Sequence, residues 1–464
     1  MGKGEKTIFE NMNPMRAVLK MALPSVAAQV ILVLYNMADL FFLGLLGSDE
    51  KLVAVTVCTP AFMFLSALGN LFGTGGGSVL SKALGQKRRE DAENAASFAV
   101  LGGAVCTLFY LLLVFLFRNP FIDLLGGRNS GFHKDAVQYL LFAVILGGPG
   151  AMGSVLLAHL LRAEGHSMKA GIGLALGGVL NVILDPVFMF LLFPAGMEVT
   201  GAAAATALSN TVALVYLAIT EKRYRKTGSV IKLRPLRGTV ARENAKKVVF
   251  AGFPSFIMTL MENVSFAVLD GILAPLGADP LAGLGVAKKI NMLAHCTVRG
   301  IAQGTLPLVA YSYGKKNIER LRKIIRSAAI LSVSCALCCT LFAQLAPGLP
   351  VRVFVRPEME SYRHAVTYLR ILSIGGPFSA FAYLTVSVYQ ATGRPKTAVI
   401  VALLRKGLLD IPGMFLLVAF GLQYFAPAAT PAADIICCVT AIIIFTRFIR
   451  ETSNIFRKDV KSND

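Results

Sequence analysis

Apolar runs long enough to cross a membrane recur along the whole sequence, and they constrain the fold more than any other feature. Of the 464 residues, 55% are hydrophobic and only 16% are charged. In lipid, only helices and closed barrels satisfy every backbone hydrogen bond, and about 20 apolar residues span the bilayer as a helix. The sequence therefore predicts an all-α polytopic membrane protein. Twelve transmembrane helices are expected, at about residues 15–44, 52–82, 95–117, 134–162, 168–193, 199–220, 246–275, 281–312, 320–346, 362–391, 396–423 and 431–449.

The positions of the lysines and arginines indicate which loops lie in the cytoplasm. The net charge is +20, but the lysines and arginines gather in short loops between the apolar runs, so no nucleic-acid partner is implied. Loops rich in these residues stay in the cytoplasm. With an even number of spans, this places both termini on the cytoplasmic side. No cleavable targeting segment is visible at the start, and we expect a multi-pass protein of a prokaryotic plasma membrane that works as a monomer.

The sequence repeats itself at an offset of 228–230 residues. The recurring landmarks are 23–25 and 253–255, 85–87 and 314–316, 148–149 and 376–377, and Gly165 and Gly393. Each copy holds six expected spans, so both copies insert in the same orientation and are related by a pseudo-two-fold axis along the membrane normal. We expect an N-terminal six-helix bundle (1–220), a basic cytoplasmic linker (221–245), a C-terminal six-helix bundle (246–450) and a cytoplasmic tail (451–464). Two similar bundles facing a cleft are typical of an alternating-access carrier.

Acidic side chains inside the apolar runs mark the candidate site. Asn181 and Asp185 lie one helical turn apart, Asp39 lies in the first span, and Thr206 in the sixth. A carboxylate at the bilayer centre costs about 2.5–3.5 kcal/mol on insertion scales and is functional by default. Two carboxylates and two neutral oxygens suit a hard cation such as Na⁺, and the same acids can carry a proton instead. The alternative is local: each acid caps a bend or pairs inside the protein.

Other polar residues in the spans are secondary candidates. Glu262 has no obvious local partner, and we expect it to face the cavity. Asp410 follows Arg405 and Lys406 by more than one turn. A buried acid and bases on one helix often pair, which favours an ion pair over a substrate site. Pro24 is the expected hinge of the first span. The sequence shows no constellation of nucleophile, base and metal ligands, so we expect neither an enzyme nor a cofactor beyond the coupling ion. The secondary candidates for lining the cavity are Gln29, Tyr35, Asn36, Glu262 and Asp410.

Several motifs together resemble one transporter family. They are YNMADLFFLG, which ends the first span, GTGGGSVLSKALGQ, NVILDPVF, TGAAAAT, and RGIAQGTLPLVAYSYGKKNIERLRK. They are similar to those of the multidrug and toxin extrusion (MATE) family, over essentially the whole chain. The resemblance implies a V-shaped pair of bundles that exports organic, often cationic and amphipathic, compounds in exchange for inward Na⁺ or H⁺. It also implies an N-terminal ion site at Asp39, Asn181, Asp185 and Thr206.

The resemblance is weaker for a second ion site. One branch of the family uses a glutamate in the seventh span, which matches Glu262, and an aspartate in the tenth span, where this chain has Phe381. We therefore place the coupling site in the N-terminal bundle. On this hypothesis, ion or proton binding at Asp39 and Asp185 favours a rearranged first span beside Pro24, and this rearrangement expels the substrate outward.

The alternative function is a flippase for lipid-linked oligosaccharides, which has the same broad architecture. Such a protein is expected to line its cavity with arginines that bind pyrophosphate, and only Arg299 and Arg405 are candidates. The intramembrane acids favour cations instead. The expected partners are small organic substrates and membrane lipid.

Overall fold

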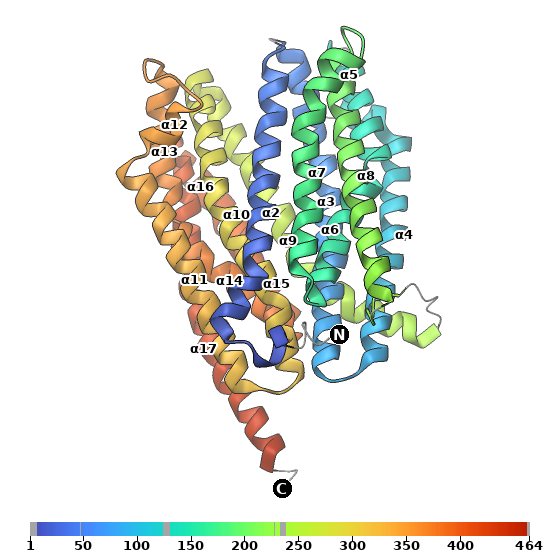
Figure 1. Cartoon of the computed structure of the whole chain (residues 1–464). Helices are drawn as coiled ribbons and strands as arrows, with labels where there is room; N and C mark the ends of the chain where they lie inside the picture. The colour runs from blue at the N-terminus through green and yellow to red at the C-terminus, as the bar shows by residue number, and fades with distance from the viewer. Residues whose placement is uncertain (1–6, 47, 124–129, 227, 233–237, 462–464) are drawn as a thin grey trace. The chain divides into compact units, whose positions relative to one another are not determined.

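A computed structural model describes residues 7–46, 48–123, 130–226, 228–232 and 238–461, and within these ranges the chain forms helices and no strand (Figure 1). The helices in chain order are η1 (Thr7–Asn11), α2 (Pro14–Gly44), α3 (Asp49–Gly85), α4 (Arg89–Ile122), α5 (His133–Tyr139), η3 (Leu140–Leu146), α6 (Gly148–Ala163), α7 (Ser167–Val187), η4 (Phe188–Leu192), α8 (Glu198–Arg225), α9 (Gly238–Leu273), η5 (Ala274–Leu276), α10 (Ala278–Gly314), α11 (Ile318–Leu345), α12 (Gly348–Arg352), α13 (Glu360–Ser373), α14 (Gly376–Thr392), α15 (Pro395–Leu403), η6 (Leu404–Leu408), α16 (Asp410–Ala419), η7 (Gln423–Ala428) and α17 (Ala429–Lys461).

The helices confirm the predicted all-α membrane fold. Among the described residues, eight helices are long and apolar enough to cross a membrane, and ten spans result if each of two bent helix pairs counts as one. The other two expected spans correspond to α10 and to the broken run α15–η6–α16, which contains buried charged side chains. Each expected span therefore has a helical counterpart.

Two of the spans are bent at equivalent places in the two halves. The axis turns by 41° between Leu146 and Gly148, and by 47° between Ser373 and Gly376. A proline follows each break, at the first turn of α6 and of α14. Proline has no N–H to donate to the preceding turn and disfavours the helical conformation in the residue before it, so the helix breaks there. The repeated Gly-Pro landmark thus becomes a repeated bend.

The described chain divides into two compact units. The first consists mainly of Ala27–Leu80 and Arg88–Phe256, and the second mainly of Ile8–Val26, Ser81–Lys87 and Ile257–Asp464. We call them unit 1 and unit 2. Helices α2, α3 and α9 each contribute residues to both units. Unit membership changes in α2 two residues after Pro24, and in α9 two residues after the equivalent Pro254.

The pseudo-two-fold relation of the repeat is visible at one reciprocal contact. In unit 2, a Cβ on Gly85 would lie 2.2 Å from the carbonyl oxygen of Tyr311, and a Cβ on Gly314 would lie 2.2 Å from that of Lys82. Adding the repeat offset of 229 residues converts Gly85 to Gly314 and Lys82 to Tyr311, so each contact is the equivalent of the other. Only glycine allows such a backbone approach, so the glycines of both copies are explained by one symmetric crossing of α3 and α10.

The described part of the connection between the two halves is tied to unit 1. The buried Glu164 carboxylate accepts hydrogen bonds from Ser229 Oγ at 2.8 and 2.9 Å and from the Val230 N–H at 2.6 Å. Helix α8 continues to Arg225 and α9 begins at Gly238, so helix replaces both ends of the predicted linker 221–245. Residues 233–237 of that linker lie outside the described ranges.

Candidate ion-coupling site

Three of the four predicted ligands form one hydrogen-bonded cluster in unit 1. Asn181 and Asp185 lie four residues apart on α7, and Thr206 lies on α8. The Asn181 Nδ2 donates to Asp185 Oδ1 at 3.0 Å and to Thr206 Oγ1 at 3.2 Å. The exposed fractions of Asn181, Asp185 and Thr206 are 2%, 0% and 5%. A buried amide thus joins the carboxylate of one helix to the hydroxyl of the next.

The fourth predicted ligand, Asp39, reaches the cluster because α2 packs closely on α7. A Cβ added to Gly178 of α7 would lie 2.8 Å from Ile31 Cγ2 and 3.2 Å from Tyr35 Cδ1 of α2. Asp39 lies one turn beyond Tyr35, and its carboxylate interacts electrostatically with that of Asp185. The structure therefore brings all four residues together.

The cluster leaves oxygen atoms without hydrogen-bond partners. Asp39 Oδ1, Asn181 Oδ1 and Asp185 Oδ2 are each buried and accept no hydrogen bond within the described chain. Burying such groups unpaired costs free energy, most of all for a charged oxygen. A bound Na⁺ satisfies carboxylate and amide oxygens directly, and a proton neutralises a carboxylate. The residues present therefore fit either coupling ion.

The secondary candidates of α2 lie in the same unit as the cluster. Gln29 is buried on α2, and Asn36 donates its Nδ2 hydrogen bond to Leu32 O of its own helix at 2.7 Å. Tyr35 and Tyr139 both interact electrostatically with Asp39 and Asp185. Tyr139, buried at the end of α5, was missed in the sequence analysis. An aromatic residue amid apolar sequence gave no signal that could have identified it.

Unit 2 contains a second set of buried polar residues, in which the acids are paired with basic side chains. Glu262 of α9 forms an ion pair with Arg299 of α10, and Glu262 Oε1 also accepts a hydrogen bond from the Tyr383 hydroxyl at 3.2 Å. Arg299 Nη2 donates to the Tyr383 oxygen at 3.3 Å. The sequence shows no local partner for Glu262, and its partner in the structure lies on another helix, 37 residues away. The Arg299 guanidinium already neutralises the one acid that the family resemblance matched to a C-terminal ion site.

The remaining buried charges of unit 2 are also paired. Asp410 accepts from Lys406 Nζ at 2.8 Å, from Ser265 Oγ at 2.7 Å and from Thr430 Oγ1 at 2.9 Å. The ion-pair interpretation of Asp410 is confirmed, with Lys406 as its partner. Arg405 instead pairs with Asp434, with a distance of 2.6 Å between Nε and Oδ1.

These features define a membrane transport protein, rather than an enzyme: the sequence of helical spans repeats in two halves, and unit 1 holds buried oxygens that suit an ion. A family model described as MatE matches residues 24–187 and again residues 254–416. The chain belongs to this family. The two matched segments are the two copies of the internal repeat.

Curated relatives and solved structures agree with this assignment. The multidrug export protein MepA of Staphylococcus aureus (strain MSSA476) is 26% identical over 437 residues, 94% of each chain. MepA of Staphylococcus saprophyticus is 27% identical over 445 residues, also 94% of each chain. A multidrug resistance MATE family transporter in an outward-facing conformation has a TM-score of 0.85 at 23% identity, covering 97% of this chain and 99% of that one. A MOP superfamily transporter from Pyrococcus furiosus, described as having a binding pocket of reverse polarity, has a TM-score of 0.86 at 23% identity, covering 98% and 99%. These structures share the fold.

Proposed function

We propose that this protein exports organic, cationic and amphipathic compounds across the plasma membrane in exchange for inward Na⁺ or H⁺. The names of the MepA relatives support drug export. The observation that carries the proposal is the cluster of Asp39, Asn181, Asp185 and Thr206, with its buried unpartnered oxygens. The monomeric state and the cytoplasmic position of both termini belong to the same proposal.

The coupling step follows from the charge of the cluster. Two carboxylates close together in a buried site repel each other, and a bound cation or proton relieves this repulsion. Ion binding therefore stabilises the state in which α2 lies close to α7 over the state in which Asp39 is farther from Asp185. The ion drives export only through this difference in affinity between two states. The change of unit membership in α2 beside Pro24 supports a hinge there.

The test is transport of a fluorescent lipophilic cation in proteoliposomes, with a sodium gradient and a pH gradient imposed separately. We expect one gradient to drive flux, and Asp39→Asn and Asp185→Asn each to reduce it to the leak rate. Asp279→Asn is the matched control, because this exposed acid at the start of α10 undergoes the same chemical change away from the cluster. Unchanged flux in both cluster variants would refute the coupling site. Absence of flux with either gradient would refute the exchange.

The flippase alternative is not favoured. Its candidate pyrophosphate ligands were Arg299 and Arg405, and both form ion pairs, with Glu262 and Asp434. An arginine neutralised by a buried carboxylate is a poor ligand for a second anion, because binding would break the pair.

A further inference from the structure

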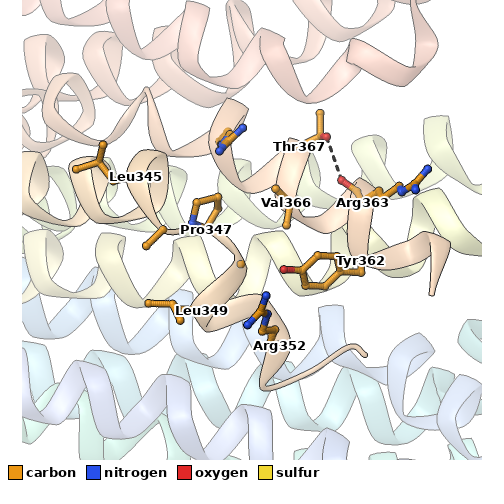
Figure 2. Close-up of a pocket in the computed structure, with 11 residues that line it drawn as sticks. Leu345, Pro347, Leu349, Arg352, Tyr362, Arg363, Val366 and Thr367 are labelled. Atoms are coloured by element: carbon orange, nitrogen blue, oxygen red, sulfur yellow. Dashed lines mark hydrogen bonds between the residues drawn. The ribbon is translucent and has the colours of Figure 1, made fainter. Parts of the chain in front are cut away.

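Unit 2 carries a cavity of about 500 Å³ that plays no part in the proposed ion coupling. The end of α11, the short helix α12 and the first turns of α13 line it. Figure 1 places α12 at the end of unit 2 opposite the C-terminal end of α17, and Figure 2 shows the cavity in close-up. The charge distribution of the sequence predicts that this end is not cytoplasmic.

Three arginines line this cavity. Arg352 lies on α12, and Arg363 and Arg370 lie two turns apart on one face of α13. None of the lining residues is acidic, and none of the three arginines forms an ion pair with a described carboxylate. The acids nearest in sequence are Glu358, before α13, and Glu360, its first residue. Neither of them lines the cavity. The cavity is therefore positively charged, at the membrane side where arginines are otherwise avoided.

The walls of the cavity are held by specific contacts. The Tyr362 hydroxyl lies against Gly348, where an added Cβ would be 2.5 Å from it, so a larger residue at this position would require the Tyr362 ring to shift. Gln344 Nε2 donates to Arg370 O at 2.7 Å and ties the end of α11 to α13. In Figure 2, Arg352 and Tyr362 lie side by side, and Leu345, Pro347 and Leu349 form the opposite wall.

Apolar side chains continue from the cavity onto the protein surface. Leu345, Leu349 and Val353 have exposed fractions of 82%, 59% and 77%. Large apolar side chains that remain this exposed at the end of a membrane span lie where lipid covers them. A ligand that suits both the arginines and this apolar rim carries an anionic head and a hydrocarbon tail.

We propose that this cavity binds an anionic phospholipid of the non-cytoplasmic leaflet. The phosphodiester accepts hydrogen bonds from Arg352 and Arg370, with Arg363 at the rim and the Tyr362 hydroxyl as a further donor. Guanidinium groups recognise phosphate oxygens through paired N–H donors. The acyl chains lie on the apolar rim. The proposal does not depend on which ion drives transport, because no residue of the ion cluster takes part.

The test is native mass spectrometry of the full-length protein in detergent, titrated with phosphatidylglycerol or with phosphatidylcholine of the same chains. We compare the wild type with the triple variant Arg352→Gln, Arg363→Gln, Arg370→Gln. Each basic residue near an anionic lipid strengthens binding about fivefold, so the triple variant should bind phosphatidylglycerol on the order of 100-fold more weakly. Binding of phosphatidylcholine should change little.

The controls separate charge, fold and ligand source. Arg356→Gln removes a neighbouring exposed arginine that does not line the cavity, and it should leave lipid binding unchanged. The triple Arg→Lys variant keeps the charge but loses the paired N–H donors, so it should bind phosphatidylglycerol more weakly than the wild type and more tightly than the triple Gln variant. Equal phosphatidylglycerol binding by wild type and the triple Gln variant would overturn the proposal. Displacement of the lipid by soluble glycerol phosphate at equal concentration would show a site for free phosphoesters, and would overturn the assignment to lipid.

Discussion

Gly178 lies where α7 packs closely on α2, the two helices that carry the carboxylates of the candidate site, and it does not itself belong to the site. An alanine at this position would place its Cβ 2.8 Å from Ile31 Cγ2 and 3.2 Å from Tyr35 Cδ1. Ordinary contacts between carbon atoms are about 3.5–4.0 Å, so α2 must move away from α7 by about 1 Å. Ile31 cannot yield easily, because a β-branched side chain in a helix has one strongly preferred rotamer.

The size of the effect follows from this clash. Overpacking a fitted contact costs about 1–3 kcal/mol. In the proposed mechanism the ion-bound cluster needs α2 close to α7, so the cost falls on that state. Gly178→Ala should then weaken the affinity for the coupling ion about 5- to 150-fold. The site oxygens themselves are unchanged. Transport at a saturating ion gradient should therefore be reduced less than transport at a low one.

The assay measures export from proteoliposomes against the concentration of the coupling ion, for Gly178→Ala and for two companions. Adding Ile31→Ala to Gly178→Ala removes the clashing methyl and should restore much of the affinity. Gly285→Ala is the control, because a Cβ there meets nothing within 4 Å. If Gly178→Ala had the ion dependence of the wild type, or if Ile31→Ala gave no recovery, the packing argument would be wrong.

Three other changes test the paired acids and the turns. Arg299→Met should lower the free energy of unfolding by about 3 kcal/mol, and with it the thermal midpoint, because the Glu262 side chain is only 13% exposed and loses its positive partner. The double variant Arg299→Met, Glu262→Gln should regain most of this loss, and no recovery would contradict the pairing. Lys87→Gly should raise stability by about 1 kcal/mol in a detergent melt, because Lys87 has a φ of 60° that costs a non-glycine residue energy, whereas Lys87→Ala should give no gain. Burial raises the pKa of Glu164 above its ordinary value, so between the two values the folded protein binds more protons than the unfolded chain, and stability falls as pH rises through that window. In Glu164→Gln the thermal midpoint should depend less on pH within this window than in the wild type. If the midpoints of the two proteins changed with pH in the same way, the assignment to Glu164 would be wrong.

Local spacing in the sequence was enough to predict much of the candidate site. Asn181 and Asp185 share a helix face because they lie four residues apart, and the helix preserves that spacing in the structure. Asp410 shows the same rule at work. Its partner is Lys406, four residues before it, and not Arg405, whose side chain points about 140° away around an ideal helix.

Ion pairs between residues on different helices could not be predicted from the sequence. Glu262 and Arg299 are 37 residues apart, and Arg405 and Asp434 are 29 apart. Such pairs depend on how the helices rotate and cross, and side-chain packing sets those angles rather than any local pattern. The π-helical turn at Leu404–Leu408 adds to the difficulty, because it shifts the faces of all residues that follow it.

The repeated bend has a consequence for the history of the chain. The turns of 41° and 47° occur at the same Gly-Gly-Pro tripeptide in each half, at 147–149 and 375–377. A shared sequence cause at equivalent positions implies that the bend was present before the gene duplicated. The ancestral protein was then a chain of six spans that already carried it. At the offset of 229 residues, Val268 and Met414 stand in the second half where the first half has Asp39 and Asp185, so the two copies kept the bend but differ in their charged residues.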